Sequence, residues 1–309
     1  MRRGLFVPSH YATWNRPEPI LSVETKRLNK ANQAPAPASA HRAEVAAGER
    51  FEFGANWASF LEVLDEGRIA SAEQSLREML ETDSLAGRRF LDAGSGSGLF
   101  SLAARRLGAT VHSLDFDPAS VACTQELRRR YFPGDPQWQV QEASVLDAAY
   151  IEQLGQFDVV YSWGVLHHTG QMWPALDNAS RCVAPGGKLF IAIYNDQGTP
   201  SRRWLRLKKI YNRSGLLKKP IAGGTAVMLW WRRWVKDALR MQPFATWRAV
   251  REERGMSAWR DVVDWVGGYP FEVAKPEEIF HFYRERGFTL MRLVTCGGSL
   301  GCNQFVFHK

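Results

Sequence analysis

A glycine-rich segment, followed by an acid at the end of the next apolar run, is the part of this sequence best suited to chemistry. Residues 90–101 read Phe-Leu-Asp-Ala-Gly-Ser-Gly-Ser-Gly-Leu-Phe-Ser, and Asp115 closes the apolar run that follows. Glycines allow a backbone to turn tightly against a ligand, because a Cβ at those points would collide with it. Strand, glycine turn, helix, strand and acid together predict a nucleotide-cradling unit in which Asp115 accepts two ribose hydroxyls.

The spacing of the glycines distinguishes this segment from a dinucleotide-binding loop. Gly94, Gly96 and Gly98 occupy every second position, and Asp92 precedes them. A G-x-G-x-x-G loop would place its third glycine where this chain has Leu99. The pattern acid-x-Gly-x-Gly-x-Gly resembles the first motif of the class I S-adenosylmethionine-dependent methyltransferases.

Later segments extend this resemblance. Residues 157–162 and 164–169 resemble the family's fourth strand and the loop after it, and residues 183–193 resemble its Pro-Gly-Gly turn and fifth strand. The resemblance implies a Rossmann-like α/β fold with a seven-stranded, mostly parallel sheet, a C-terminal antiparallel hairpin and a helical lid inserted after strand five. It also implies S-adenosyl-L-methionine as cofactor and S-adenosyl-L-homocysteine as product.

The family's cofactor contacts carry over to eight positions. The glycines approach the methionine and ribose portions, while Asp92 holds either the loop or the cofactor's amino group. Phe116 offers adenine an apolar face, and Ser144 stands where the family often has an acid. The predicted cofactor-binding residues are Asp92, Gly94, Gly96, Gly98, Asp115, Phe116, Ser144 and Val145.

Candidate catalytic residues follow the fourth and fifth strands. His167 and His168 lie on the ligand side of the sheet, and a neutral imidazole suits a general base near pH 7. A histidine at such a place is also often a hydrogen-bonded structural residue. We predict catalytic roles for His168, His167 and Tyr194, and acceptor contacts for Trp163, Asn195, Asp196 and Trp57.

The region after the fourth strand also has the general look of ubiquinone-pathway O-methyltransferases, which bind a divalent cation through Glu-x-x-Glu-His. Residues 164–168 read Gly-Val-Leu-His-His, so both acids are missing. Hard cations prefer oxygen ligands, and we therefore expect no metal. The same resemblance includes an insert after strand five that contacts membranes.

The chain divides into an arm, residues 1–48, and one domain, residues 49–309. The arm is poor in large apolar residues and is predicted to be mobile. Residues 50–86 carry apolar side chains at helical spacing, which predicts two leading helices with a break at Glu66-Gly67. These helices either pack plainly on the sheet or close over the cofactor.

The domain itself alternates predicted strands and helices. Strands are expected at 89–92, 110–115, 138–142 and 157–162, and Asp117-Pro118 is expected to begin a helix. Two further strands, at 288–295 and 302–307, are joined by a short Gly-rich link. Such a link cannot hold a crossover helix, so this pair must be antiparallel.

An insert at 196–266 concentrates the positive charge of the chain. Residues 201–254 hold fifteen Lys and Arg against three acids, an excess of twelve, whereas the whole chain carries only +8. Seven of the twelve tryptophans lie in the insert, with residues 227–234 resembling an interfacial helix. This composition fits a lid over the acceptor, a membrane-contacting helix within 201–254, or an RNA surface. The phosphate-contacting residues of an RNA enzyme would be Arg202, Arg203, Lys208, Lys209, Arg232 and Arg233.

Together these features predict a methyltransferase acting on a small or medium-sized acceptor, most readily at oxygen. Transfer to nitrogen, sulfur or carbon, an RNA-modifying enzyme, and a non-catalytic cofactor-binding protein are the alternatives. The sequence has no secretory signal or bilayer-spanning segment, and its four cysteines lack a paired spacing. We expect a cytoplasmic protein, with peripheral membrane contact as a variant of that location.

Overall fold

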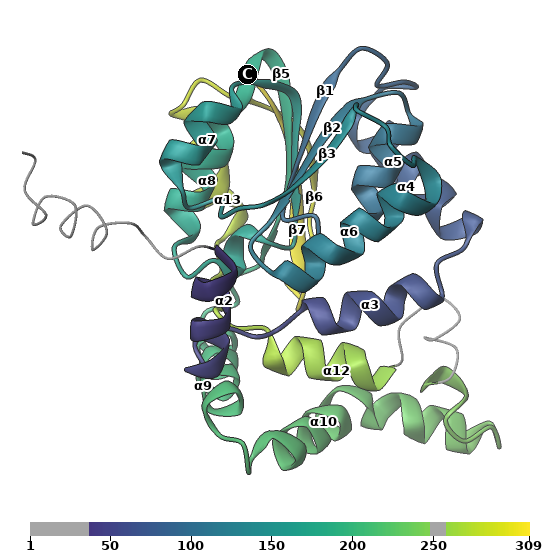
Figure 1. Ribbon diagram of the computed structural model, residues 1–309. Helices are drawn as coiled ribbons and strands as arrows, with labels where there is room; N and C mark the ends of the chain where they lie inside the picture. The colour runs from purple at the N-terminus through teal and green to yellow at the C-terminus, as the bar shows by residue number, and fades with distance from the viewer. Residues whose placement is uncertain (1–36, 248–257) are drawn as a thin grey trace, which may run out of the picture. The chain divides into compact units, whose positions relative to one another are not determined.

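The structure is a computed structural model that describes residues 37–247 and 258–309. Seven strands form one sheet in the order β3-β2-β1-β4-β5-β7-β6 (Figure 1). The strands are β1 (Arg89–Ala93), β2 (Thr110–Asp115), β3 (Trp138–Glu142), β4 (Phe157–Trp163), β5 (Val183–Tyr194), β6 (Thr289–Val294) and β7 (Cys302–His308). The first five are mutually parallel, and β7 is antiparallel to both β5 and β6. The sheet and its C-terminal hairpin are therefore confirmed.

Helices cover both faces of the sheet because its strands are apolar on both sides. One face packs against α4 (Glu66–Leu80), α5 (Leu99–Arg106) and α6 (Pro118–Tyr131), around Phe90, Leu102 and Trp138. The other face packs against α7 (Ala148–Leu154), α8 (Met172–Arg181) and α13 (Pro276–Arg284). Parallel strands surrounded in this way bring their carboxyl ends to one edge, where α/β proteins bind ligands.

Capping residues fix where several of these helices begin. Asp117 accepts a hydrogen bond from Ala119 N at 2.9 Å and Pro118 opens α6, as its sequence predicts. Asp65 caps α4 by accepting from Arg68 N. Glu66-Gly67 consequently lies in the first turn of α4, so the predicted break there is wrong. The interruption comes earlier, after α3 (Gly54–Glu62).

The predicted arm extends too far along the chain. Residues 37–46 form α2 (Pro37–Ala46), although this segment has few apolar residues of its own. It is held instead by contacts with the domain: Ala38 N donates to Glu142 Oε1 at 2.6 Å, and the ring of His41 packs edge-on against Phe116. Residues 1–36 lie outside the described part of the chain.

The fifth strand also differs from expectation. The segment Pro185-Gly186-Gly187, predicted as a turn before the strand, lies within β5 itself. The pairing with β4 shifts there, between Phe157 and Val159, so the Pro-Gly-Gly segment forms an irregularity in a continuous strand.

The insert after β5 is helical, as predicted. It contains α9 (Thr199–Arg213), α10 (Lys218–Leu239) and α12 (Ala258–Gly267), and residues 248–257 lie outside the described part. Helix α12 contacts both α9 and α10. Figure 1 shows α12 between α3 and α10, below the sheet edge formed by the strand carboxyl ends. Within the described residues, no helix is both long and apolar enough to span a bilayer.

Candidate active site

The glycine loop joins β1 to α5 at the carboxyl edge of the sheet. Gly94, Gly96 and Gly98 all have positive φ, at 94°, 54° and 81°. A Cβ at Gly94 would lie only 2.3 Å from Val165 Cγ1, and one at Gly98 would lie 2.8 Å from Thr124 Cα. Side chains are therefore excluded from the loop by backbone conformation and by packing together. The three backbone positions are fixed for close approach of another group.

Asp115 ends β2 and holds this loop. Its Oδ2 accepts from Gly96 N at 2.9 Å, and its Oδ1 accepts from Asp117 N at 2.9 Å. Burial raises the pKa of the carboxyl to about 6, against the opposing effect of these backbone donors. Each carboxylate oxygen still has acceptor capacity beyond its backbone bond, as the predicted ribose contacts require.

Asp92 is buried among polar side chains beneath the loop. Ser101 Oγ donates to its Oδ2 at 2.5 Å, and Ser113 Oγ lies 2.7 Å from Ser101 Oγ. Trp138 Nε1 then donates to Ser113 Oγ at 2.9 Å. This network joins β1, α5, β2 and β3. Of the two predicted roles of Asp92, the structure displays the one that holds the loop and its helix.

The Asp92→Asn variant is expected to flatten the dependence of stability on pH. Burial raises the pKa of Asp92 to about 7 from an ordinary 3.8, so the folded state binds the extra proton between these values. Proton binding to Asp92 therefore stabilises the folded state in full below about pH 4. This stabilisation, roughly 4 kcal/mol at most, is lost as pH rises towards 7. Urea unfolding at several pH values should show a smaller loss in the variant. An equal loss in both proteins would contradict the assignment. Asp115, whose pKa is also raised, retains its own part of the slope in both.

A cap formed by residues 37–62 covers the predicted adenine side. The guanidinium of Arg50 lies 4.9 Å from the centre of the Phe116 ring, and the same side chain donates to His168 O at 2.9 Å. Gly54 N donates to Asp117 Oδ2 at 2.7 Å. A Cβ at Gly54 would lie 2.5 Å from the Ala119 Cβ, so only glycine permits this contact. The leading segment therefore closes over the site.

Trp57 reaches the glycine loop from the same cap. A Cβ at Gly96 would lie 3.2 Å from both Cε2 and Nε1 of Trp57, so the indole rests against the loop backbone. Trp57 was predicted to contact the acceptor, yet its neighbour here is the predicted cofactor loop. Ser144 and Val145 follow β3 at the same edge. The Ser144 hydroxyl accepts from Leu146 N, and Val145 is buried.

The predicted catalytic residues form one buried cluster at the ends of β4 and β5. The rings of His167 and Tyr194 have centroids 4.0 Å apart, and those of His168 and Tyr194 are 5.4 Å apart. His168 Nδ1 lies 2.6 Å from Pro270 O, which makes Nδ1 the protonated nitrogen and leaves Nε2 as an acceptor. Phe53 of the cap packs on the His168 ring at 5.0 Å.

Burial keeps both imidazoles neutral. It lowers the pKa of His168 to about 3, and it also lowers that of His167 well below the ordinary value. Tyr194 is partly buried, and the loss of water around its ring raises the pKa of its hydroxyl. These shifts favour hydrogen bonding by the three side chains over proton exchange near pH 7.

Lys208, on α9, is part of the same cluster and was not among the predicted catalytic residues. Its ammonium donates to Trp265 O and lies 4.6 Å and 4.7 Å from the ring centres of Trp265 and Phe271. The side chain is fully buried. The helical spacing in the sequence could have identified Lys208 as buried. The residues that share the inward face of α9 are Ser201, Trp204, Lys208 and Tyr211.

The other predicted acceptor contacts are spread along the same edge. Asn195 accepts from Asn303 Nδ2 at 3.0 Å, and Asp196 accepts from Gly198 N at 2.8 Å, so both organise the turn into α9. Trp163 is 45% exposed, and its Nε1 donates to Gln304 Oε1 at 3.2 Å. Trp163 therefore contacts a side chain of β7 and is not part of the histidine cluster.

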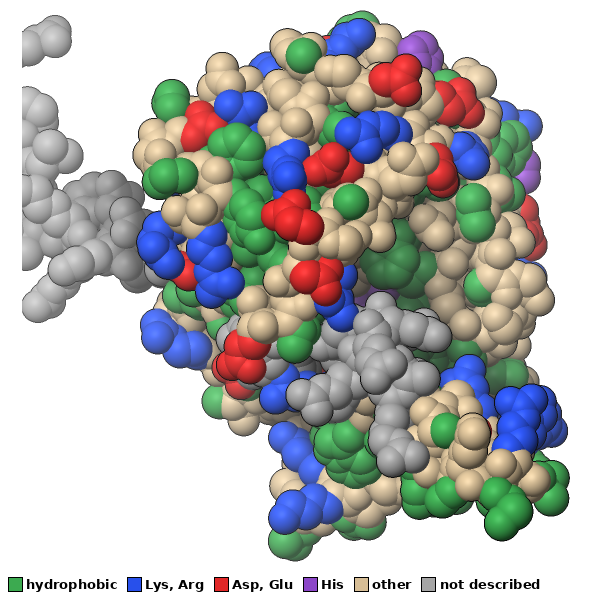
Figure 2. Space-filling model, turned by 90° about the vertical axis from the view of Figure 1, so that its right-hand side faces the viewer, with side chains coloured by type: hydrophobic (Ala, Val, Ile, Leu, Met, Phe, Trp, Pro, Cys, Tyr) green, Lys and Arg blue, Asp and Glu red, His purple; other side chains and the backbone are tan. Residues whose placement is uncertain are grey.

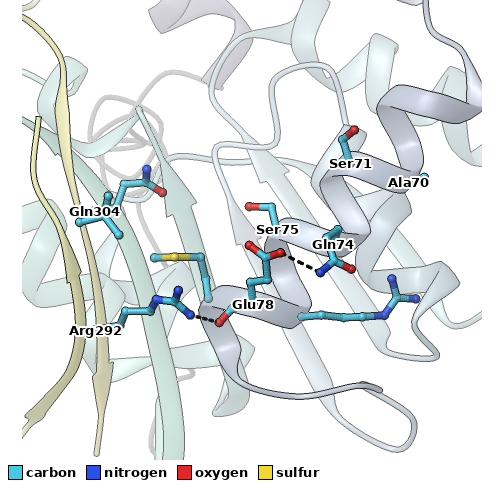
Figure 3. Close-up of a pocket in the computed structure, with 10 residues that line it drawn as sticks. Ala70, Ser71, Gln74, Ser75, Glu78, Arg292 and Gln304 are labelled. Carbon is cyan, nitrogen blue, oxygen red and sulfur yellow. Dashed lines mark hydrogen bonds between the residues drawn. The ribbon is translucent and has the colours of Figure 1, made fainter.

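Gln304 also lines a groove that is separate from this cluster. The groove lies between α4 and the β6–β7 hairpin, with Ser71, Gln74 and Glu78 on one side and Arg292 on the other (Figure 3). Arg292 closes part of it by donating to Glu78 O. Among the described residues that line the groove, none is a predicted site residue.

The tryptophans of the insert are divided between inward and outward positions. Trp230 is buried against Trp247, and Trp234 packs on Trp247 as well, so the predicted interfacial belt is wrong for these two residues. Trp231 is half exposed. Lys208 cannot contact an RNA phosphate, as the RNA alternative would require, because it is buried.

The sheet order, the glycine loop with positive φ and the acid closing β2 agree with the resemblance to class I S-adenosylmethionine-dependent methyltransferases. Residues 91–189 match the family described as "Methyltransferase domain". The finding confirms the resemblance stated from the glycine motif. The match ends within β5, before the insert.

Two curated relatives are similar to part of this chain. A tRNA U34 carboxymethyltransferase of Methylococcus capsulatus is 32% identical over 134 residues, 41% of this chain and 40% of that protein. A ubiquinone biosynthesis O-methyltransferase of Xanthomonas oryzae pv. oryzae is 37% identical over 111 residues, 36% of this chain and 45% of that protein. The chain thus matches under half the length of either relative.

Solved structures are similar at low sequence identity. Magnesium protoporphyrin IX methyltransferase from Synechocystis PCC 6803, with bound S-adenosylhomocysteine, is 13% identical with a TM-score of 0.47, over 79% of this chain and 84% of that one. The N-methyltransferase NodS from Bradyrhizobium japonicum WM9 is 17% identical with a TM-score of 0.45, over 80% and 99% of the two chains.

Proposed function

We propose that this protein transfers the methyl group of S-adenosylmethionine to a small or medium-sized acceptor, at oxygen. The proposal rests on one observation: the glycine loop and the histidine cluster lie next to each other at one edge of the sheet. The glycine loop and Asp115 offer backbone and carboxylate contacts, and the His167–His168–Tyr194 cluster offers a dry aromatic environment. An activated methyl donor requires chiefly alignment and exclusion of water, which a dry aromatic environment favours.

The geometry fits the cofactor. The loop backbone is bare of side chains where the methionine and ribose portions would lie, and Asp115 retains acceptor capacity for ribose hydroxyls. Phe116 lies on the same edge, where adenine would compete with the Arg50 guanidinium for the ring face. The cap rests on both regions, through Trp57 on the loop and Phe53 on His168. Entry of the cofactor would therefore require the cap to move.

The function is tested by calorimetric titration of the protein with S-adenosylmethionine and S-adenosylhomocysteine. Micromolar binding of both ligands is the expected result, followed by release of S-adenosylhomocysteine in the presence of a methyl acceptor. Binding without turnover on oxygen, nitrogen, sulfur or carbon acceptors would favour the non-catalytic alternative. Absence of binding would overturn the proposal.

No metal is expected to be needed. Among the described residues, no three His, Cys, Asp or Glu side chains gather in an arrangement that could hold one.

The outward face of α10 favours a membrane as a second partner. Apolar side chains at helical spacing are exposed there: Val227, Met228, Trp231, Val235 and Leu239. Arg232 and Lys236 flank them on the same helix, and Arg240 is its C-cap residue. Hydrophobic side chains lie next to Lys and Arg along the lower edge of Figure 2, where α10 lies in Figure 1. Such a helix suits the boundary of an anionic bilayer.

The triple variant Val227→Ser, Trp231→Ser and Val235→Ser is expected to lose membrane binding. Each change removes exposed apolar surface, and together they should reduce the fraction bound to phosphatidylglycerol-containing vesicles at least about tenfold. Co-sedimentation measures this fraction. Leu293→Ser, an exposed apolar residue on β6, is the matched control and should leave binding unchanged. Equal sedimentation of the wild type and triple variant would contradict the membrane role.

An RNA acceptor predicts a different behaviour. Arg202, Arg203, Lys209, Arg232 and Arg233 would bind phosphates, and affinity would fall steeply with salt because counterions are released. A flat salt response would exclude this alternative. The buried position of Lys208 removes one of its expected contacts.

A further inference from the structure

Arg50 of the cap bridges the ends of two strands at the carboxyl edge of the sheet. Its guanidinium carbon lies 4.9 Å from the centre of the Phe116 ring, just after β2. Its Nη1 donates to His168 O at 2.9 Å and its Nη2 donates to Thr169 O at 3.5 Å, both after β4. Because β1 lies between β2 and β4, the bridge joins the two strand ends that flank the glycine loop.

The guanidinium is held in this position from the cap side as well. Its Nε donates to Glu44 Oε2 of α2 at 2.5 Å, and the side chain of Arg50 is only 15% exposed. Hydrogen bonds of a charged guanidinium are stronger than neutral ones, and its attraction to a ring face increases when water is removed. Arg50 therefore occupies one defined place and is not free to sample solvent.

Phe116 is covered further by α2 and by the segment before α3. The ring of His41 packs on Phe116 with centroids 5.5 Å apart and an angle of 77° between the ring planes. His41 Nε2 lies 3.8 Å from Asp117 Oδ2, which also accepts from Gly54 N at 2.7 Å. The cap is thus anchored on both sides of the ring that is predicted to face adenine.

The spacing above Phe116 decides whether adenine fits beside Arg50. A purine stacked between two flat groups keeps about 3.5 Å from each, so the two groups must lie roughly 7 Å apart. The guanidinium carbon of Arg50 is only 4.9 Å from the centre of the Phe116 ring. Adenine can therefore stack on this face only after Arg50 has left it.

We propose that Arg50 is an autoinhibitory contact, which closes the adenine face of Phe116 and competes with S-adenosylmethionine for that place. This inference rests on the proposed methyltransferase function and concerns the regulation of the same site. Binding of the cofactor breaks the bridge from Arg50 to the segment after β4. The measured affinity is consequently lower than the intrinsic affinity of the open site, by the fraction of molecules in which Arg50 has moved away.

The first test is calorimetric titration of the wild type and Arg50→Ala with S-adenosylhomocysteine. Arg50→Ala is expected to bind at least about fivefold more tightly, because its site no longer has to be opened. Adenosine lacks the homocysteine part of this ligand. It should gain affinity by a similar factor, since the competition is for the face of Phe116.

Thermal unfolding with and without S-adenosylhomocysteine gives an independent readout. Without ligand, Arg50→Ala should unfold at a lower temperature than the wild type, because the bonds to Glu44, His168 and Thr169 are lost. At saturating ligand the two proteins should unfold at nearly the same temperature, because the wild type has lost the same bridge. The ligand-induced rise in unfolding temperature is therefore larger in the variant.

Three further variants control the result. Arg42→Ala removes an exposed arginine of α2 and should change neither the affinity nor the ligand-induced rise. Glu44→Gln weakens the anchor of Arg50 and should show a smaller gain in the same direction. Arg50→Lys keeps the charge but lacks the fork that reaches two carbonyls, so it should also gain part of the affinity. It keeps the test decisive if Arg50→Ala fails to fold.

The remaining outcomes separate this inference from the proposed function. Weaker ligand binding in Arg50→Ala would show that Arg50 holds the cofactor and would overturn autoinhibition. Unchanged affinity, with an equal loss of unfolding temperature with and without ligand, would show a purely structural arginine and would also overturn it. Both results leave the methyltransferase intact. Failure of the wild type and all variants to bind S-adenosylhomocysteine would overturn the proposed function itself.

Discussion

Replacement of Asp115 by alanine is expected to weaken S-adenosylmethionine binding at least about 100-fold. Two charge-assisted hydrogen bonds to ribose would be lost, each contributing about 1.5 kcal/mol or more, and tenfold in affinity corresponds to about 1.4 kcal/mol. The variant also releases Gly96 N and Asp117 N, which the carboxylate holds at 2.9 Å. Calorimetric titration of wild type and variant gives the two affinities directly.

Two controls make this result interpretable. Glu62→Ala removes an exposed acid at the end of α3 and should leave the affinity unchanged. Asp115→Asn keeps the size and one acceptor oxygen, so it should hold part of the loop and show an intermediate loss. If Asp115→Ala bound the cofactor as tightly as the wild type while folded, the ribose would lie elsewhere, and the assignment of this edge as the cofactor site would fail.

Gly94→Ala is expected to abolish cofactor binding and to destabilise the domain. The backbone there has φ of 94°, which costs an L-residue about 1–2 kcal/mol. The new Cβ would also lie 2.3 Å from Val165 Cγ1, so either the loop or the segment after β4 must move. Both movements displace the backbone that the cofactor would contact. Thermal unfolding and calorimetric titration measure the two effects.

Gly134→Ala separates strain from packing. Gly134 has φ of 72° and open space around its hypothetical Cβ, so alanine there imposes a similar backbone cost without a clash. We expect it to lower the unfolding temperature modestly and to leave cofactor binding unchanged. The double variant Gly94→Ala and Val165→Ala should recover part of the stability, because it removes the colliding methyl groups. Equal losses in Gly94→Ala and Gly134→Ala would show that packing against Val165 is unimportant.

The cap connects the two halves of the site. The ring of Phe51 packs closely against Gly267, where a Cβ would lie only 2.3 Å from the ring. Phe53 packs on His168. The same segment places Trp57 on the glycine loop. Movement of the cap would therefore expose both the proposed cofactor region and the proposed acceptor region. These contacts would therefore couple any movement of the cap to opening of both proposed regions.

The sequence predicted the sheet, its antiparallel hairpin and the position of the glycine loop. These features depend on local patterns: apolar runs of strand length, glycines at every second position and the Asp117-Pro118 helix start. The class of cofactor was implied by the resemblance of the glycine motif to the class I S-adenosylmethionine-dependent methyltransferases. These patterns depend on residues that are close together in the sequence, so they could be recognised without knowledge of distant contacts.

Features that depend on distant contacts were decided by the tertiary structure. Helix α2 lacks an apolar face of its own and is held by Glu142 and Phe116, which are far along the chain. Trp230 and Trp234 face inward because Trp247 covers them. Lys208 differs from Lys209 only by its direction on α9, yet α12 buries the first and leaves the second in solvent. Composition identifies a basic segment, whereas the burial that lowers the pKa of one of its amines arises only when separate helices pack together.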